Sequence, residues 1–116
     1  MNATEAARAF YAAIDEDRYD DLADLLAAEF VHQRPDRTFE GRETFVEFMR
    51  DDRPHTDTAH AIGAVYVEEN GSSTTSVNEV AVRGRLLGAD DDRLFGFVDV
   101  HTIEDGSIAR IDTYTD

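Results

Sequence analysis

The segment LFGFVDVHTIEDG, at residues 94–106, places a carboxylic acid and an imidazole two positions apart in an alternating pattern. If it forms a strand, Phe97, Asp99 and His101 project from one face, together with further apolar residues. A buried ionised carboxylate is costly unless it is paired, so Asp99 should be neutral or have a partner. Such a carboxyl group can serve as a pocket acid or base with a raised pKa, and a structural hydrogen-bonded pair is the alternative.

A second imidazole, His32, lies in FVHQR at residues 30–34, which reads as a strand, and it shares a face with Arg34. Histidine suits general-base chemistry near neutral pH. The predicted catalytic set is therefore Asp99 as acid, base or oxyanion stabiliser, His32 as the partner base and His101 as the orienting group. The alternative for His32 is a structural histidine at the edge of the core.

Two further histidines, His55 and His60, lie close to Asp57. Their spacing matches no compact metal motif, such as two histidines separated by three residues on a helix. The chain also lacks a glycine-rich phosphate-binding loop. We therefore predict no metal site and no organic cofactor.

Charge is the strongest compositional signal of these 116 residues. There are 26 acidic and 11 basic residues, all of the latter Arg, for a net charge of -15. This composition resembles that of proteins from salt-loving microbes, and it predicts a solvated acidic surface whose repulsion salt would screen. The same field repels phosphate backbones, which argues against nucleic acid as a partner.

Other compositional features bear on where the protein works. The sequence has no cysteine, so a disulfide framework and thiolate metal sites are excluded. It has no apolar run long enough to span a membrane, and its first residues do not resemble a signal peptide. These features favour a cytoplasmic protein, with one domain over residues 1–116 and no membrane partner.

The elements that would position these side chains can be read from hydrophobic spacing. Residues 3–14 are rich in Ala and place Ala7, Phe10, Tyr11 and Ile14 at helical intervals, which predicts an amphipathic helix. The remaining predicted elements are a short helix around Leu22, a strand at 29–34, a short strand before Gly41, a helix after it, and β-rich segments at 58–69, 74–87, 93–104 and 107–115. Helices followed by a strand meander indicate an α+β fold, with N-terminal helices packed on a curved antiparallel sheet.

This order of elements, together with FVHQRPDRTFEGRETFVEFM and FVDVHTIEDGSIARIDTY, resembles the nuclear transport factor 2-like superfamily. The similarity spans essentially the whole chain and is strongest to the SnoaL-like and ketosteroid isomerase branch. It implies a cone-shaped fold with a cavity at its open end. The superfamily includes enzymes and non-enzymatic modules, so the fold alone does not give the function.

The resemblance also implies candidate site residues. Ketosteroid isomerases combine a late-strand Asp, a first-helix Tyr and a carboxylate base before the third helix. Asp99 matches the late-strand Asp. Counting back from the glycine puts the base position at His32, and aligning on the proline puts it at Arg34. The Tyr position falls on Phe10, with Tyr11 one step along the helix.

Two functions follow as hypotheses. The first is a small-molecule-binding SnoaL-like protein that catalyses proton transfer, such as isomerisation, cyclisation or hydration, on a hydrophobic substrate. The second is a non-catalytic homodimeric module that binds a ligand or a protein. The predicted pocket residues are Phe10, Tyr11, Arg34, Asn78 and Phe97. Members of the superfamily often dimerise through the outer sheet face, which would make Arg83 and Arg85 interface candidates or ordinary surface ion-pairing residues.

Overall fold

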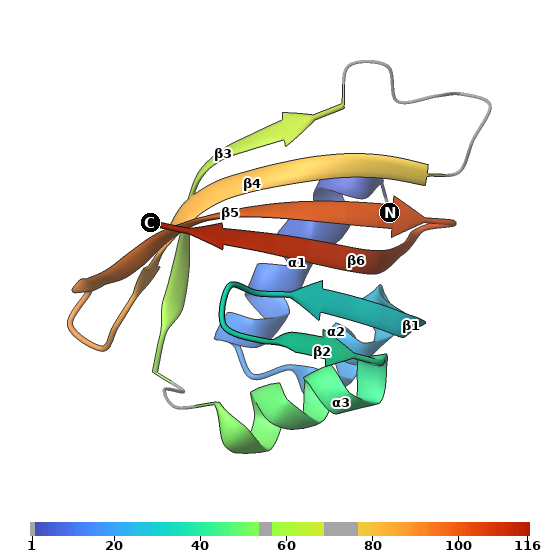
Figure 1. The fold of residues 1–116 in the computed structure, drawn as a ribbon. Coiled ribbons are helices and arrows are strands. Elements are labelled where there is room, and N and C mark those ends of the chain that lie inside the picture. The colour runs from blue at the N-terminus through green and yellow to red at the C-terminus, as the bar shows by residue number, and fades with distance from the viewer. Residues whose placement is uncertain (1, 54–56, 69–76) are drawn as a thin grey trace.

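A computed structural model describes residues 2–53, 57–68 and 77–116 of the chain. Among these residues, two helices come first, two strands and a third helix follow, and four longer strands complete the chain, in the order that the sequence predicts (Figure 1). The elements are α1 (Ala3–Asp15), α2 (Tyr19–Leu25), β1 (Leu26–Gln33), β2 (Thr38–Glu40), α3 (Arg42–Glu47), the π-helical turn η1 (Phe48–Asp52), β3 (Ala59–Val67), β4 (Val77–Leu87), β5 (Arg93–Glu104) and β6 (Ser107–Thr115). No helix among the described residues is long and apolar enough to span a membrane.

Helix α1 forms where the Ala-rich spacing predicts it. Its first turn is capped by Asn2, whose side-chain oxygen accepts a hydrogen bond from the Glu5 backbone N–H at 2.8 Å. The predicted stripe is buried, and it includes Phe10, Tyr11 and Ile14. Burial of this face fixes the rotation of the helix, and the rotation decides which α1 side chains reach the sheet.

The six strands form one sheet in the order β2-β1-β6-β5-β4-β3. Strands β3 to β6 make the predicted antiparallel meander, and β2 pairs antiparallel with β1. The prediction of a wholly antiparallel sheet is wrong at one place, because β1 runs parallel to β6. Parallel neighbours need a long crossover, and here the whole chain from β2 to β5 provides it. The sheet is therefore mixed.

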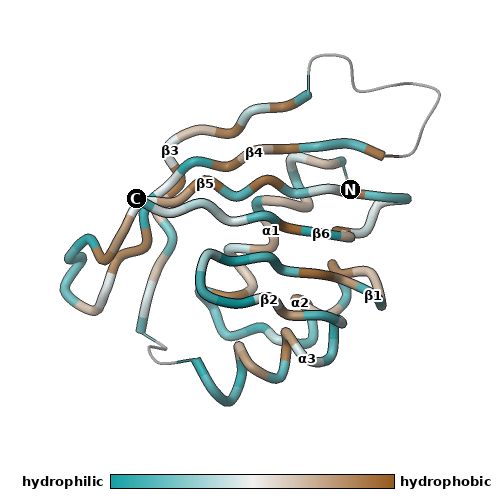
Figure 2. Tube along the Cα trace, viewed as in Figure 1, coloured by the Kyte–Doolittle hydropathy of each residue, from teal (hydrophilic) through white to brown (hydrophobic). Residues whose placement is uncertain are grey.

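The three helices cover one face of the curved sheet, with α1 crossing behind β5 and β6 and α3 lying below β2 (Figure 1). Apolar stretches alternate with polar ones along the strands (Figure 2). In β5 the buried positions include Phe97, Asp99, His101 and Ile103. The predicted face of β5 thus points toward α1, and it carries its carboxylate and imidazole into the core.

Candidate functional site

Asp99 lies at the centre of a buried polar network between α1 and the sheet. Its side chain accepts two short hydrogen bonds, from the Tyr11 hydroxyl to Oδ2 at 2.6 Å and from Thr113 Oγ1 to Oδ1 at 2.5 Å. Tyr11 comes from α1, and Thr113 lies opposite Asp99 in the β5–β6 register. The residue is only 7% exposed. Helix and strand together therefore hold both carboxylate oxygens in place.

Each hydroxyl in turn contacts a histidine. His101 Nε2 lies 2.8 Å from the Tyr11 hydroxyl, and His32 Nε2 lies 2.7 Å from Thr113 Oγ1. The two predicted histidines thus reach Asp99 through an intervening hydroxyl rather than directly. We call these five residues the Asp99 network.

The direction of the hydrogen bonds follows from the other ring nitrogens. Nδ1 of His32 and Nδ1 of His101 are buried and have no hydrogen-bond partner within the described part of the chain. A proton on either Nδ1 would be a buried donor without an acceptor, so the proton belongs on Nε2. Both imidazoles then donate to the hydroxyls, and both hydroxyls donate to Asp99. The network therefore presents Asp99 as a hydrogen-bond acceptor.

Burial sets the protonation of the network. It raises the pKa of Asp99 above its usual value, and the hydrogen bonds from Thr113 and Tyr11 oppose this shift in part. Burial lowers the pKa of His101 to about 4. Burial, with the nearby positive charge of Arg34, lowers the pKa of His32 to about 3. Both histidines are accordingly neutral near pH 7, beside a carboxylate of increased basicity.

A cavity of about 460 Å³ opens beside this network. It is large enough for a small organic molecule. Its lining includes residues from α1, β1, α3, η1 and the four strands β3 to β6, and others from the segments between these elements. The lining residues are Phe10, Ile14, His32, Arg34, Pro35, Asp36, Phe45, Phe48, Met49, Arg53, Thr58, His60, Leu86, Leu94, Phe95, Phe97, Asp99, Thr113, Thr115 and Asp116. Most of the surface that faces the cavity is apolar. Asp99 is the most buried acid of the lining.

Three of the five predicted pocket residues line this cavity. Phe10, Arg34 and Phe97 line it, while Tyr11 stands behind Asp99 and contacts the carboxylate. Asn78 is not among the residues that line this cavity. This residue faces the helix side near the start of β4, where it pairs with Ile103, whereas the cavity meets β4 only near its other end.

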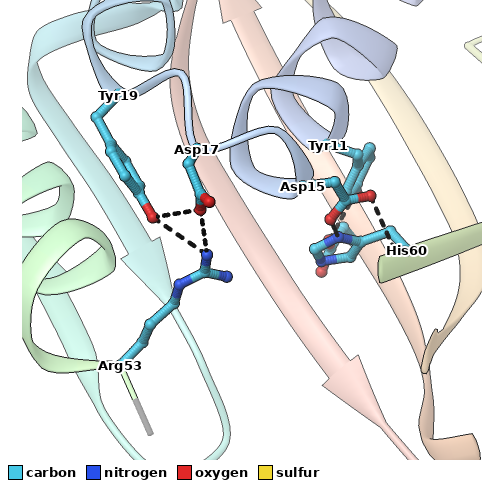
Figure 3. Close-up of polar contacts among 7 residues, drawn as sticks. Tyr11, Asp15, Asp17, Tyr19, Arg53 and His60 are labelled. Carbon is cyan, nitrogen blue, oxygen red and sulfur yellow. Dashed lines mark hydrogen bonds and ion pairs between the residues drawn. The ribbon is translucent and has the colours of Figure 1, made fainter. Parts of the chain in front are cut away.

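A second acid–base pair borders the cavity and was not found from the sequence. Asp15, the last residue of α1, binds His60 twice: Oδ1 lies 2.6 Å from the ring Nδ1, and Oδ2 accepts the His60 backbone N–H at 2.9 Å (Figure 3). The His60 ring packs against Tyr11 with 5.0 Å between centroids. Asp15 thereby fixes the orientation of the His60 ring. The other ring nitrogen, Nε2, has no hydrogen-bond partner within the described chain.

A buried guanidinium also borders the cavity. Arg53 Nη2 lies 3.1 Å from Asp17 Oδ1 and 3.1 Å from the Tyr19 hydroxyl (Figure 3). The Arg53 side chain is 6% exposed, whereas that of Asp17 is 58% exposed. The sequence offers no periodic signal for this group, because Arg53 follows the end of η1.

Potential metal ligands do not gather in the described part of the chain: no group of three or more His, Asp or Glu side chains is placed to hold an ion. Asp57 and His60, which the sequence analysis considered as possible metal ligands, belong to the described part. His55 lies outside the described residues.

Comparison with known proteins identifies the family to which this chain is similar. The family model described as the SnoaL-like domain matches residues 7–111. A search of curated proteins gives no significant match. Among solved structures, a nuclear transport factor 2-like protein of unknown function from Cytophaga hutchinsonii is 15% identical with a TM-score of 0.80, over 100% of this chain and 91% of that one.

Two further structures carry functional names. A "putative ketosteroid isomerase" from Kribbella flavida is 18% identical with a TM-score of 0.79, and the match covers 97% of this chain and 76% of that one. A "putative polyketide cyclase" from Sinorhizobium meliloti is 15% identical with a TM-score of 0.76, over 95% and 94% of the two chains. At these identities the similarity establishes the shared fold.

Proposed function

Because this chain belongs to the SnoaL-like domain family, we propose that it binds a small apolar molecule in the cavity beside Asp99 and catalyses proton transfer on it. Isomerisation, cyclisation and hydration all fit this description, since each moves a proton to or from carbon or oxygen. The names of the Kribbella and Sinorhizobium structures, an isomerase and a cyclase, belong to the same range of chemistry.

One observation carries the proposal: Asp99 borders the cavity as an acceptor whose pKa is raised by burial. A carboxylate with a raised pKa is a stronger base than an exposed one and suits proton abstraction closer to neutral pH. Asp99 is thus proposed as the proton acceptor. Tyr11 and Thr113 would position it, and His101 and His32 would hold those hydroxyls in their donating orientation.

An oxyanion role for Asp99 and Tyr11 together is less well supported. That role needs both groups to donate hydrogen bonds to the substrate. Here the Tyr11 hydroxyl is already engaged by Asp99 and His101, and Tyr11 does not line the cavity. His60, which does line it and is held by Asp15, is the better second group for returning the proton.

Deuterium exchange tests this function without knowledge of the natural substrate. The carbon acid 2-tetralone, an apolar ketone with acidic α-protons, would be incubated in heavy water and followed by NMR. Wild-type protein should exchange these protons faster than Asp99→Asn by roughly a hundredfold or more, the usual range for a general base. The matched control is Asp24→Asn, an exposed residue on α2. Equal rates for wild type and Asp99→Asn, both above buffer, would contradict the role of Asp99.

A non-catalytic homodimeric module is the second candidate, and the outer face of the sheet favours it. Tyr114 and Tyr66 are 62% and 52% exposed there, and the Arg83 guanidinium lies 6.0 Å from the centre of the Tyr66 ring. Aromatic and Arg side chains are enriched at interfaces. If this face pairs, Tyr114→Glu should convert a dimer to a monomer in analytical ultracentrifugation. Leu94→Glu, an exposed apolar position that borders the cavity instead, should not.

A further inference from the structure

Arg53 is the most buried cation on the wall of the cavity, and its charge is poorly compensated. Among the described residues, its only acidic contact is Asp17, an exposed carboxylate at 3.1 Å. The other contact of its Nη2 is the neutral Tyr19 hydroxyl. A buried charge normally requires full pairing and hydrogen bonding. Arg53 therefore has more capacity for an anion than its present neighbours use.

The count of donors supports this view. A guanidinium has five N–H groups, and both hydrogen bonds found for Arg53 involve Nη2. Its Nε is buried and, within the described part of the chain, has no hydrogen-bond partner. Leaving such a donor unsatisfied in a native protein is costly enough to need an explanation. Arg53 also lines the cavity, so a ligand oxygen that drew its guanidinium toward the cavity would provide the missing acceptor.

Other charged groups at the cavity do not already satisfy Arg53. Asp36 and Asp116 are exposed lining residues, and each pairs with a different arginine, Arg34 at 3.6 Å and Arg93. The carboxylate of Asp99 receives its own donors from Tyr11 and Thr113 (see above). The acids of the lining are thus engaged elsewhere, and Arg53 retains free donors.

We propose that Arg53 binds the anionic group of an otherwise apolar ligand, a carboxylate or sulfonate that accepts from Nε–H and a terminal N–H of the guanidinium. Such paired hydrogen bonds are the characteristic way in which Arg binds carboxylates and tetrahedral oxyanions. The apolar part would contact the Phe45, Phe48 and Phe95 side chains that also line the cavity. This inference rests on the proposed function, since it needs the cavity to be a binding site.

The net charge of the protein helps to distinguish binding of an anion at Arg53 from general attraction of anions to the protein. A protein of net charge -15 repels small anions at long range, and molar salt removes most of that repulsion. A preference for an anionic ligand in molar KCl would therefore have to come from a local cation, and Arg53 is the candidate.

The test compares two fluorescent probes that share one skeleton. 1-Anilinonaphthalene-8-sulfonate is anionic, and N-phenyl-1-naphthylamine is the same molecule without the sulfonate. Both would be titrated in 2 M KCl. Arg53→Met should weaken binding of the sulfonate probe roughly ten- to a hundredfold, as expected for loss of a charged hydrogen bond, and change the neutral probe less than twofold. Arg50→Met, an exposed arginine paired with Asp51, is the matched control and should change neither.

A second variant keeps the test decisive if Arg53→Met does not fold. Asp17→Asn removes the carboxylate that competes for Arg53, so it should tighten binding of the sulfonate probe and leave the neutral probe unchanged. Asn is also tolerated at this position, where φ is 55°. If Asp17→Asn leaves sulfonate binding unchanged, or Arg53→Met weakens both probes equally, the anion site is overturned.

The failure of the anion site can be told apart from failure of the cavity. Met49→Trp should fill part of the cavity and weaken both probes. Suppose that the neutral probe binds wild type and that Met49→Trp weakens this binding, but that Arg53→Met leaves binding of the sulfonate probe unchanged. The cavity is then a binding site, and only the anion site is wrong. If neither probe binds wild type, or Met49→Trp binds both as well as wild type does, the proposed binding function fails and the inference fails with it.

Discussion

The position of Asp99 is tied to the orientation of four other side chains. In the state favoured by the unpartnered Nδ1 atoms, the two imidazoles and two hydroxyls all donate toward the carboxylate. Each carboxylate oxygen has two lone pairs, so it can keep its hydroxyl donor and still accept a proton from a substrate in the cavity. The same hydroxyls and histidines can therefore hold Asp99 in place before and after proton transfer.

The buried histidines predict a pH dependence of stability. The pKa of His101 is lowered to about 4 in the folded state, against an ordinary value of about 6.5. Between these two pH values the unfolded chain binds a proton that the folded chain does not, so stability falls as the pH drops from about 6.5 to 4. Asp99, whose pKa is raised, contributes in the opposite direction as the pH falls.

His101→Gln isolates this contribution, because the Gln amide can still donate to Tyr11 but does not titrate. The free energy of unfolding of the wild type should fall between pH 6 and pH 5 by roughly 1 kcal/mol per pH unit more than that of the variant. Urea unfolding in molar KCl at pH 7, 6 and 5 measures the difference. Parallel pH curves for the two proteins would mean that His101 is not held neutral.

The chemistry of the site was only partly visible in the sequence. Asp99 and His101 were found because strand alternation puts them on one face with apolar residues. Thr113, His60 and Arg53 were not found, because their roles depend on contacts between residues far apart in the chain. The Asp15–His60 contact, for example, spans 45 residues and joins a helix end to a strand start. The spacing of residues within one segment contains no information about contacts between distant segments.

At the scale of elements, the rotation of α1 decides which aromatic residue meets Asp99. Successive helical residues point about 100° apart, so Phe10 and Tyr11 cannot both face β5 in the same way. Phe10 stacks on Phe45 with centroids 6.0 Å apart and borders the cavity, while Tyr11 extends to Asp99. The family alignment pointed to Phe10 at the tyrosine position, and the contact is made from the next residue along.

The close approach of β3 and β4 next to the cavity predicts a sensitive glycine. A Cβ at Gly84 would lie 2.6 Å from the carbonyl oxygen of Ala61 and 3.0 Å from the Phe97 ring. Gly84→Ala should therefore destabilise the protein by roughly 1–3 kcal/mol, the usual cost of overpacking. At Gly63 the nearest atom to an added Cβ is 3.4 Å away, at the carbonyl oxygen of Arg83.

Urea unfolding of Gly84→Ala beside Gly63→Ala checks this prediction, and Gly63→Ala serves as the matched control. Both glycines have ordinary negative φ angles or extended backbone, so the comparison concerns contact rather than backbone conformation. Equal stability of the two variants would show that β3 can move away from β4 at little cost.

The arrangement of elements was largely predictable, and the exception has a physical reason. Helical spacing located α1, and turn residues such as Asp105 and Gly106 separated β5 from β6. Pairing of β1 with β6 was not predictable, since these strands are distant in sequence and share no turn. Their parallel direction follows from the global path of the chain, which local patterns do not encode.

At the scale of the whole molecule, the unbalanced charge predicts dependence on salt. The chain has 15 more acidic than basic residues and no Lys, and self-repulsion of such a charge destabilises the compact state. The Debye length falls from about 10 Å at 0.1 M to about 3 Å at 1 M ionic strength. We therefore expect the melting temperature to rise steeply with KCl up to about 1 M, where most of the screening is complete.

A charge-reduced variant separates screening from general salt exclusion. Asp24, Glu29 and Glu104 are exposed and form no ion pair in the described structure, so Asp24→Asn, Glu29→Gln and Glu104→Gln together remove three negative charges without breaking a contact. This variant should melt higher than wild type in dilute buffer and gain less from KCl, with the two melting curves converging near 1 M. If wild type melts at the same temperature in dilute buffer and in several molar KCl, the acidic surface is not an adaptation to salt. If instead both proteins gain equally and continue to gain beyond 1 M, preferential exclusion of salt rather than charge screening stabilises the fold.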